Sequence, residues 1–409
     1  MDRDPDVLII GGGVAGLFSA YHLRLSGCSV AVVERGPIGG PQSCSSGNTG
    51  FVGTQGSAPL AEPGVPAQGL RWLLNPESPF YIKPRPDPAL LAWLWHFRRA
   101  CTAEAAQASF RILLDLKQRS LAMLRDLCTP DTLTANGMVV AFKTPQAFEK
   151  AARALPPGVP LRVLEPAELS ALEPGVEFDI AGALYNEEGA YLRVPSFLTE
   201  LAGTLTGMGV DLHEHTEVTG FETTGHRVRQ VRTTRGDFRP GETVIAAGTW
   251  SAACARKLDV KLRLQPAKGY TVTVKTSPGA PRLPVLLSEG KVALTPLGDR
   301  LRLGGTLELA GLDGRISRRR VDGILRAVRS HLPALDTSAT LDTWSGFRPC
   351  TPDSLPYIGR AAPYRNLVIA CGHGHIGLGL APAGGRLVAQ IVSGAEPDVD
   401  LTPFRVDRY

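Results

Sequence analysis

Three glycines near the start of the chain have the spacing of a phosphate-binding turn. Gly11, Gly13 and Gly16 follow a short apolar run and precede a helix-like segment. Gly11 permits a tight turn, Gly13 lets a pyrophosphate approach the backbone, and Gly16 allows the helix to pack closely on the strand. The N–H groups at the start of that helix, around Val14 and Ala15, would face the phosphates. The spacing therefore predicts a dinucleotide-binding turn.

An acidic residue stands where the second strand of the same unit should end. A second apolar run over residues 29–33 is closed by Glu34, about 20 residues after the glycines, and Arg35 follows. A carboxylate at that place can accept hydrogen bonds from ribose hydroxyls. Strand, glycine turn, helix, strand and acid together predict a βαβ unit, and they do not distinguish NAD from FAD.

One arginine lies in an apolar segment where a cation needs a partner. Arg348 stands between Phe347 and Pro349 in a strand-like stretch. Burying an unpaired cation is costly, and the guanidinium fork matches a carboxylate through two hydrogen bonds. We therefore expect Arg348 to bind a ligand carboxylate. An internal salt bridge is the alternative interpretation.

A second glycine-rich segment precedes the last predicted helix. Its residues are Gly372, His373, Gly374, His375, Ile376 and Gly377. Such a loop lets the backbone approach a ligand closely, and the helix N-terminus behind it favours negative charge. The two histidines have no evident third ligand, so we predict no metal site. We count His373 among the candidate catalytic residues.

The composition is that of a globular protein and excludes several classes. The 409 residues are 43% hydrophobic and 20% charged, with a net charge of +5. No stripe of Lys and Arg interleaved with aromatic residues is present, so a nucleic-acid partner is not expected. The seven dispersed cysteines lack zinc-site spacing and are typical of reduced thiols in the cytoplasm. The acidic N-terminus lacks the basic start of a signal peptide, and no apolar run reaches the ~18 residues of a spanning helix.

Apolar periodicity predicts the elements that position these residues. Helices are expected over 17–26, 90–97, 104–128, 194–206, 318–331 and 376–392. Buried strands are expected over 7–10, 29–33, 243–248, 341–347 and 366–370, with several more between 262 and 306. Val218 is expected at the end of a strand, and residues 37–70 are expected to form an ordered irregular loop.

Taken together, these motifs resemble the flavoprotein family of D-amino acid oxidases and dehydrogenases. The resemblance spans nearly the whole chain and is strongest to the branch of bacterial D-amino acid dehydrogenase small subunits. Its marks are Gly11–Gly16 with Glu34 and Arg35, Ser45–Gly50, Pro59–Pro66, Lys268–Tyr270, Trp344–Pro349 with Thr351–Asp353, and Gly372–Gly374. The segments Pro59–Pro66 and Lys268–Tyr270 favour the dehydrogenase branch.

The resemblance implies an FAD cofactor held without a covalent bond, since related enzymes with a cysteinyl flavin attach it at a position other than Cys350. Besides the glycine turn with Glu34 and Arg35, it assigns these residues to FAD: Ser45, Ser46, Asn48, Gly50, Val218, Ala247, Gly248, Trp250, Gly346, Arg348, and residues 372–377. It places the family's carboxylate-binding arginine at Arg348. The dipole of the last helix would then raise the electron affinity of the flavin.

One departure from the oxidase pattern concerns the substrate pocket. Animal D-amino acid oxidases and glycine oxidases carry a tyrosine at the start of the strand that here begins with Ala293. Tyr270 is a candidate catalytic residue that would partly substitute for it. The competing interpretation is an ordinary aromatic residue of a strand, because tyrosine is common in strands.

Residues 90–97 form an unusually apolar and aromatic segment. Contact with a membrane surface near a quinone is one interpretation. A helix packed into the substrate domain, or a contact between subunits of an oligomer, is the interpretation that we favour, because eight residues make a short interfacial anchor.

The expected fold is of the α/β class. A discontinuous Rossmann-type FAD domain, made of 1–50, 196–250 and 345–409, joins a substrate domain, made of 51–195 and 251–344, with a mainly antiparallel sheet. The expected reaction is oxidative deamination of small D-amino acids, D-proline or hydroxy-D-proline among them, by hydride transfer from the α-carbon to flavin N5. Electrons would pass to a quinone or protein acceptor, which suits a cytoplasmic enzyme peripheral to the inner face of the membrane. The alternatives are a glycine/sarcosine-type oxidase that uses O2 and a non-catalytic flavoprotein subunit.

Overall fold

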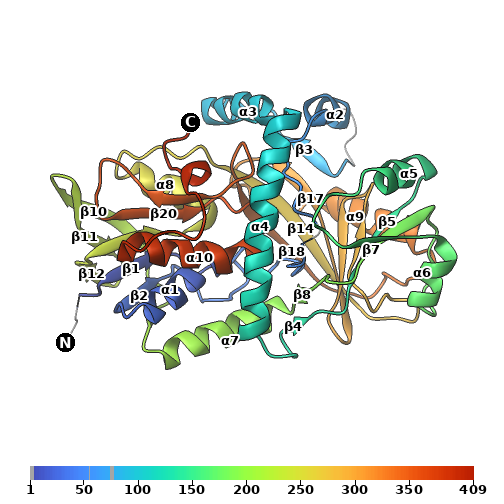
Figure 1. Ribbon diagram of the computed structural model, residues 1–409, viewed down its shortest axis with the longest axis horizontal. Helices are drawn as coiled ribbons and strands as arrows, with labels where there is room; N and C mark the ends of the chain where they lie inside the picture. Colours follow the sequence, from blue (N-terminus) through green and yellow to red (C-terminus); the bar gives the residue numbers. More distant parts are fainter. Residues whose placement is uncertain (1–3, 55, 74–77) are drawn as a thin grey trace.

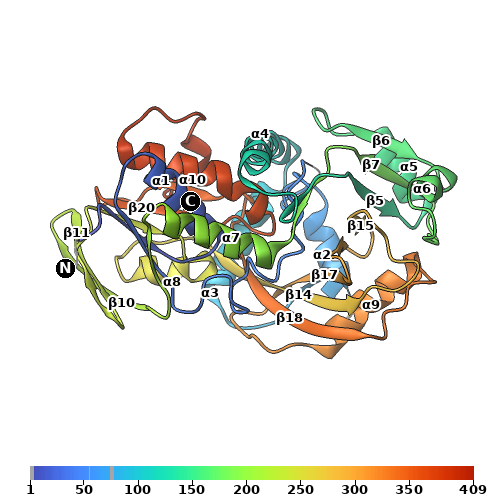
Figure 2. The same ribbon diagram turned by 90° about the horizontal axis from the view of Figure 1, so that it is seen from below.

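The chain folds around two large β-sheets that lie on either side of one long helix (Figure 1). The computed structural model describes residues 4–54, 56–73 and 78–409. A six-stranded sheet forms one half of the molecule and a nine-stranded sheet forms the other (Figures 1 and 2). The long helix, α4 (Ala103–Leu127), crosses the molecule between them.

The six-stranded sheet has the order β19-β20-β13-β1-β2-β9. Its strands are β1 (Val7–Ile10), β2 (Val30–Val33), β9 (Asp211–His213), β13 (Glu242–Ile245), β19 (Tyr357–Arg360) and β20 (Leu367–Cys371). All neighbouring strands pair in parallel except β19, which runs antiparallel to β20. Both β1 and β2 are buried over their whole length, as expected for a parallel sheet covered on both faces.

Helices and a small sheet cover the two faces of this sheet. On one face lie α1 (Val14–Leu25), α7 (Val194–Gly207) and α10 (Gly377–Ser393), which share a core with the apolar side chains of β1 and β2. The other face packs against α8 (Ser251–Arg256) and a three-stranded sheet of β10 (Val218–Thr224), β11 (Arg227–Thr233) and β12 (Gly236–Phe238). This is the expected Rossmann-type layer arrangement.

The nine-stranded sheet has the order β18-β14-β17-β16-β15-β5-β7-β6, and β3 pairs with β17. Its strands are β3 (Phe80–Ile82), β5 (Met138–Phe142), β6 (Leu161–Leu164), β7 (Gly182–Asn186), β14 (Gln265–Lys275), β15 (Val285–Leu287), β16 (Val292–Pro296), β17 (Arg300–Leu309) and β18 (Thr340–Cys350). Only the pairs β15–β5 and β17–β3 are parallel, so the expectation of a mainly antiparallel sheet is confirmed. α9 (Arg318–His331) packs its apolar stripe on this sheet through Ile324 and Val328.

The remaining elements complete the two halves. They are α2 (Val65–Leu73), α3 (Pro88–Ala100), α5 (Pro145–Arg153), α6 (Pro166–Leu172), the paired strands β4 (Leu133–Thr134) and β8 (Tyr191–Leu192), and two 3-10 turns at Gly248–Trp250 and Thr402–Phe404. α4 lies against α10 and buries Leu113, Leu116, Lys117 and Leu121 on its inner side.

Two local expectations were wrong. Val218 opens β10 and does not end a strand, because the chain turns at the end of β9 before it pairs again with β11. The segment 37–70 is not wholly irregular, since α2 begins at Val65. The short strands β3 to β9, β11, β12 and β19 were not anticipated either.

The apolar segment 90–97 belongs to α3, which is capped by the Asp87 side chain. Leu90, Trp93 and Phe97 are buried, and the Trp93 indole N–H donates to the Cys350 carbonyl at 2.9 Å. The opposite side of the helix is exposed at Trp95. In the part of the chain that is described, no helix is long and apolar enough to cross a membrane.

The division into two domains at the expected boundaries stays a prediction. The six-stranded sheet draws its strands from within 1–50, 196–250 and 345–409. β18 starts at Thr340 and pairs with β14 along its length, so the boundary at 345 falls inside a strand of the other sheet. We propose that this segment changes domain after Cys350.

Candidate active site

A long cleft opens where the parallel strands of the six-stranded sheet end. Its empty space, open solvent included, is about 1480 Å³. The strand ends at Ile10, Val33 and Cys371 line it, as expected for a ligand site in a doubly wound sheet. Fifteen of the predicted cofactor residues are in its lining: Gly11, Gly13, Val14, Ala15, Glu34, Arg35, Ser45, Asn48, Val218, Ala247, Gly248, Trp250, His373, Gly374 and Gly377.

The glycine turn has the geometry that its spacing predicts. Gly11 has a φ of +116°, and a Cβ there would lie 2.6 Å from the Ala246 carbonyl oxygen, so a side chain is excluded. A Cβ at Gly16 would collide with the Gly11 carbonyl, which shows how closely α1 packs on β1. At Gly13 the nearest atom to an added Cβ is Ser45 Oγ at 3.7 Å, which leaves the backbone open to the cleft.

Glu34 is held by backbone donors at the edge of the cleft. Its Oε2 accepts from the Gly12 N–H at 2.8 Å and its Oε1 from the Gly36 N–H at 3.2 Å. A carboxylate has about four acceptor positions, so each oxygen keeps one for a ligand hydroxyl. Arg35 next to it stacks on the Trp250 ring at 3.8 Å and forms one wall of the cleft.

Arg302 ties the loop after β2 to the nine-stranded sheet. Its Nη1 donates to the carbonyls of Ser46 at 3.1 Å and Asn48 at 2.9 Å. On the same loop Ser45 Oγ accepts from the Val14 N–H at 3.2 Å, at the first turn of α1. The loop is therefore fixed from both halves of the molecule.

Eight predicted cofactor residues lie outside the lining of the cleft: Gly16, Ser46, Gly50, Gly346, Arg348, Gly372, His375 and Ile376. Packing accounts for some of these positions. The Ser46 hydroxyl donates to the Gly39 carbonyl, Gly50 lies against the Leu192 carbonyl, and Gly346 leaves space for the Trp344 ring. The structure does not bring these three to the cleft.

The sequence analysis did not predict several residues that line the cleft, among them Cys44, Thr249, Lys257 and Phe347. Thr249 Oγ1 is buried and has no hydrogen-bond partner among the described residues, which leaves it available to a ligand. Its place directly after Gly248 could have indicated it. Burial raises the pKa of the Cys44 thiol to about 11, so this cysteine is protonated and a poor nucleophile.

Arg348 lies beside the cleft, on β18, between two residues that line it. Its Nη1 donates to the Thr306 carbonyl at 2.7 Å. The guanidinium is close enough to Cys44 and His375 for its charge to act on both. It makes no ion pair with a carboxylate in the described part of the chain. The guanidinium therefore keeps donors for a ligand anion, as expected from the sequence.

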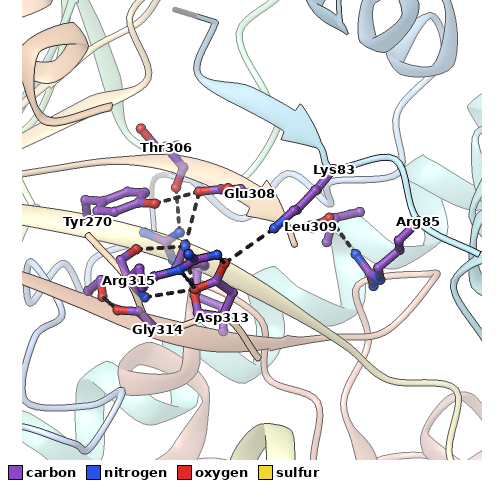
Figure 3. Close-up of polar contacts among 12 residues, drawn as sticks. Lys83, Arg85, Tyr270, Thr306, Glu308, Leu309, Asp313, Gly314 and Arg315 are labelled. Carbon is purple, nitrogen blue, oxygen red and sulfur yellow. Dashed lines mark hydrogen bonds and ion pairs between the residues drawn. The ribbon is translucent and has the colours of Figure 1, made fainter. Parts of the chain in front are cut away.

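Tyr270, the other candidate for substrate contact, is not brought to Arg348. Strand alternation places Gly269 and Arg348 on one face of the sheet and Tyr270 on the other. The Tyr270 hydroxyl is fully buried and donates to Glu308 Oε2 at 2.6 Å (Figure 3). Its position is that of a core residue, packed in the apolar cluster of the nine-stranded sheet.

Of the two histidines in the loop before α10, His373 is buried and His375 is partly buried, and both are uncharged at neutral pH. Burial lowers the pKa of His373 to about 4. Burial, and then the charges of Arg348 and Lys117, lower the pKa of His375 to about 3. Within the described ranges no third His, Cys, Asp or Glu joins them in a metal-binding group.

The chain belongs to the family of FAD-dependent oxidoreductases, whose model matches residues 6–391. It is 35% identical to a D-amino acid dehydrogenase of Methylobacterium radiotolerans, over 98% of this chain and 99% of that protein. A D-amino acid dehydrogenase of Granulibacter bethesdensis is 33% identical over the same shares. Among solved structures, glycine oxidase from Geobacillus kaustophilus matches with a TM-score of 0.79 and 26% identity, covering 100% of both chains. L-proline dehydrogenase from P. horikoshii shares the fold, with a TM-score of 0.76 and 20% identity over 100% of this chain and 98% of that one.

The cofactor is FAD, and the cleft fits it. The open backbone at Gly13 and the N-terminus of α1 suit a pyrophosphate, while the Glu34 carboxylate suits a ribose. The buried Thr249 hydroxyl adds a polar group that has no other partner among the described residues. The individual FAD contacts stay predictions.

Replacing Arg302 with methionine should weaken FAD binding. The loss of two charge-assisted hydrogen bonds to the loop after β2 would free Ser46 and Asn48, and we expect the FAD dissociation constant to rise roughly tenfold or more. Fluorescence of released flavin during dilution measures this. Arg300→Met on the same strand, where the side chain is 59% exposed, is the matched control. Equal FAD retention in both variants would contradict the anchoring role.

Proposed function

We propose that the protein oxidises small D-amino acids, using FAD, and passes the electrons to an acceptor other than oxygen. The observation that carries this proposal is the guanidinium of Arg348, held beside the cleft with donors to spare. The two D-amino acid dehydrogenases that resemble the chain over almost its whole length support the substrate class.

In this mechanism Arg348 binds the substrate carboxylate and thereby orients the α-carbon. The bound flavin supplies the acceptor for the hydrogen and electron pair that leave the α-carbon. The substrate becomes an imine, which water hydrolyses to a keto acid and ammonia. No general base is needed if the amine arrives neutral. His373 and His375 are uncharged near neutral pH, so they add no positive charge that would compete with Arg348 for the substrate carboxylate.

We propose a quinone or a partner protein as the electron acceptor, and a peripheral position on the cytoplasmic face of a membrane. The substitution by Ala293 of the tyrosine found in oxidases supports a dehydrogenase. Trp95 and Leu91 on the outer side of α3, exposed by 55% and 64%, are candidates for contact with a membrane or another subunit. Sedimentation with anionic lipid vesicles tests the membrane position.

A second candidate function is a glycine/sarcosine-type oxidase. The glycine oxidase of Geobacillus kaustophilus, similar over the full length, supports it. Peroxide formed as fast as the substrate is consumed would favour the oxidase. A flavoprotein subunit without activity is the third candidate, and a flavin that no amino acid reduces would favour it.

Anaerobic bleaching of the flavin absorbance tests the proposal. The panel should contain D- and L-amino acids, glycine, sarcosine, D-proline and 4-hydroxy-D-proline. We expect rapid bleaching by one or more small D-amino acids and slow recovery in air. Bleaching only by L-amino acids, or by none, would contradict the substrate class while leaving the fold and cofactor unaffected.

A further inference from the structure

Arg348 lies in a slot that the backbone of two other strands forms. A Cβ at Gly269 on β14 would overlap the guanidinium, so this glycine leaves the space that Arg348 occupies. The Thr306 carbonyl on β17 accepts from its Nη1 at 2.7 Å. The direction of the guanidinium therefore depends on where β17 places that carbonyl.

A β-bulge in β17 sets the position of the Thr306 carbonyl. Lys268 pairs with Glu308 and Tyr270 pairs with Gly305, so two residues of β17 oppose the single residue Gly269. The first of the two, Thr306, has a φ of +66°, a backbone conformation that is unfavourable for a β-branched residue. Strain of this kind persists only where the surroundings hold the backbone in place.

A buried polar cluster on the other face of the sheet holds the bulge (Figure 3). Glu308 Oε2 accepts from the Tyr270 hydroxyl at 2.6 Å and lies 3.6 Å from Lys268 Nζ. All three side chains are buried. Because they come from the residue pairs on either side of the bulge, their contacts keep β14 and β17 in the shifted register.

The cluster is in turn fixed by the chain after β17. Lys268 Nζ donates to the carbonyls of Asp313 at 2.8 Å and Arg315 at 3.0 Å. The Asp313 carboxylate pairs with Arg315 at 2.7 Å and with Lys83 beside β3 at 3.4 Å (Figure 3). Glu308 thus has little freedom to move along the strand.

We infer that Tyr270 and Glu308 are positioning residues for Arg348: their hydrogen bond, on the far face of the sheet, fixes the bulge whose Thr306 carbonyl orients the guanidinium toward the substrate carboxylate. They touch neither substrate nor cofactor in this arrangement. The inference rests on the proposed function only in taking Arg348 as the carboxylate-binding residue.

The test compares Tyr270→Phe and Glu308→Gln with Tyr185→Phe. Tyr185 is buried in the same core, and its hydroxyl bonds the Asn136 carbonyl far from the bulge. We expect the first two variants to raise KM, or the apparent substrate dissociation constant in anaerobic flavin reduction, roughly three- to tenfold, with the limiting reduction rate and FAD binding unchanged. Tyr185→Phe should leave all three quantities unchanged.

A double-mutant cycle separates positioning from general loosening of the core. In an Arg348→Leu background, Tyr270→Phe should cause no further loss in the second-order rate constant of flavin reduction, because the group that it positions is absent. Additive losses in the double variant, or wild-type substrate binding in both Tyr270→Phe and Glu308→Gln, would overturn the inference.

A second readout does not depend on turnover. Propionate binding, followed by its perturbation of the flavin absorbance, should weaken in Tyr270→Phe and Glu308→Gln and remain unchanged in Tyr185→Phe. If propionate binds with this pattern while no amino acid reduces the flavin, the proposed function fails and the inference stands. If the wild type binds propionate no better than Arg348→Leu, the inference fails.

Discussion

Replacing Arg348 with leucine is expected to lower kcat/KM by about 10²- to 10⁴-fold while FAD stays bound. Each hydrogen bond to a charged group contributes about 1.5–3 kcal/mol, and a bidentate carboxylate contact contains two of them. The loss should fall mainly on KM, because the residue binds the part of the substrate that does not react. FAD should remain because the side chain lies outside the lining of the cleft.

Two variants serve as comparisons for Arg348→Leu. Arg348→Lys keeps the charge but loses the planar fork, so an intermediate KM is expected. Arg302→Met should instead lose FAD, since its side chain anchors the loop after β2. Steady-state kinetics with the best D-amino acid, alongside the flavin content of each preparation, measure both effects. A normal KM in Arg348→Leu would remove the basis of the assignment.

Between pH 7 and pH 9.5, the free energy of unfolding of the wild type is expected to rise by about 3 kcal/mol relative to that of a Lys117→Met variant. Lys117 is buried on the inner side of α4, and its Cε would lie 3.3 Å from a Cβ added at Gly379 of α10. Burial lowers its pKa from 10.5 to about 7. Each unit of pKa shift corresponds to about 1.36 kcal/mol, and methionine keeps an unbranched chain in the same space.

The free energy of unfolding of the wild type should rise with pH relative to that of Lys117→Met. The folded-state pKa lies below the unfolded one, so the unfolded chain binds more protons between pH 7 and 10.5. Wild-type stability therefore rises with pH in this window, by about 3 kcal/mol between pH 7 and pH 9.5 relative to the methionine variant. Well below pH 7, where Lys117 is protonated in both the folded and the unfolded state, the difference in free energy of unfolding between the two proteins should no longer change with pH.

Urea unfolding of both proteins from pH 6 to 9.5 measures this difference. Lys150→Met on the surface of α5 is the matched control and should change the free energy of unfolding little at any pH. A difference between wild type and Lys117→Met that does not vary with pH would show that the buried ammonium is compensated by its surroundings. Lys117 would then be protonated in the folded protein throughout this pH range.

The parts of the site that could be predicted are those in which a local residue pattern dictates a backbone. Gly11 and Gly16 have no room for side chains, and Glu34 ends a strand of fixed length, so their spacing alone implies the dinucleotide unit. The long helix over 103–127 carries a clear apolar period, and its predicted range was correct within a residue or two at each end.

Contacts between distant segments could not be predicted in this way. Arg302 and the loop that it anchors are about 250 residues apart, and no local pattern records that contact. Tyr270 was a candidate for substrate contact, with an ordinary aromatic residue of a strand as the competing interpretation. The face of the sheet to which it points follows from the register of its pairing with β18. The buried state of Lys117 likewise depends on α10, which the chain reaches 260 residues later.

The sequence by itself determined the dinucleotide-binding unit, because turn geometry and strand burial are short-range constraints. Its resemblance to a flavoprotein family indicated the class of protein and the cofactor, and the side-chain chemistry of a guanidinium in an apolar strand predicted Arg348 as the carboxylate-binding residue. Only the tertiary structure decided the orientation of the Arg348 guanidinium. Its direction comes from a bulge in one strand, an absent side chain in another and a buried hydrogen bond on the far side of the sheet, and these meet only when strands distant in sequence are brought into register.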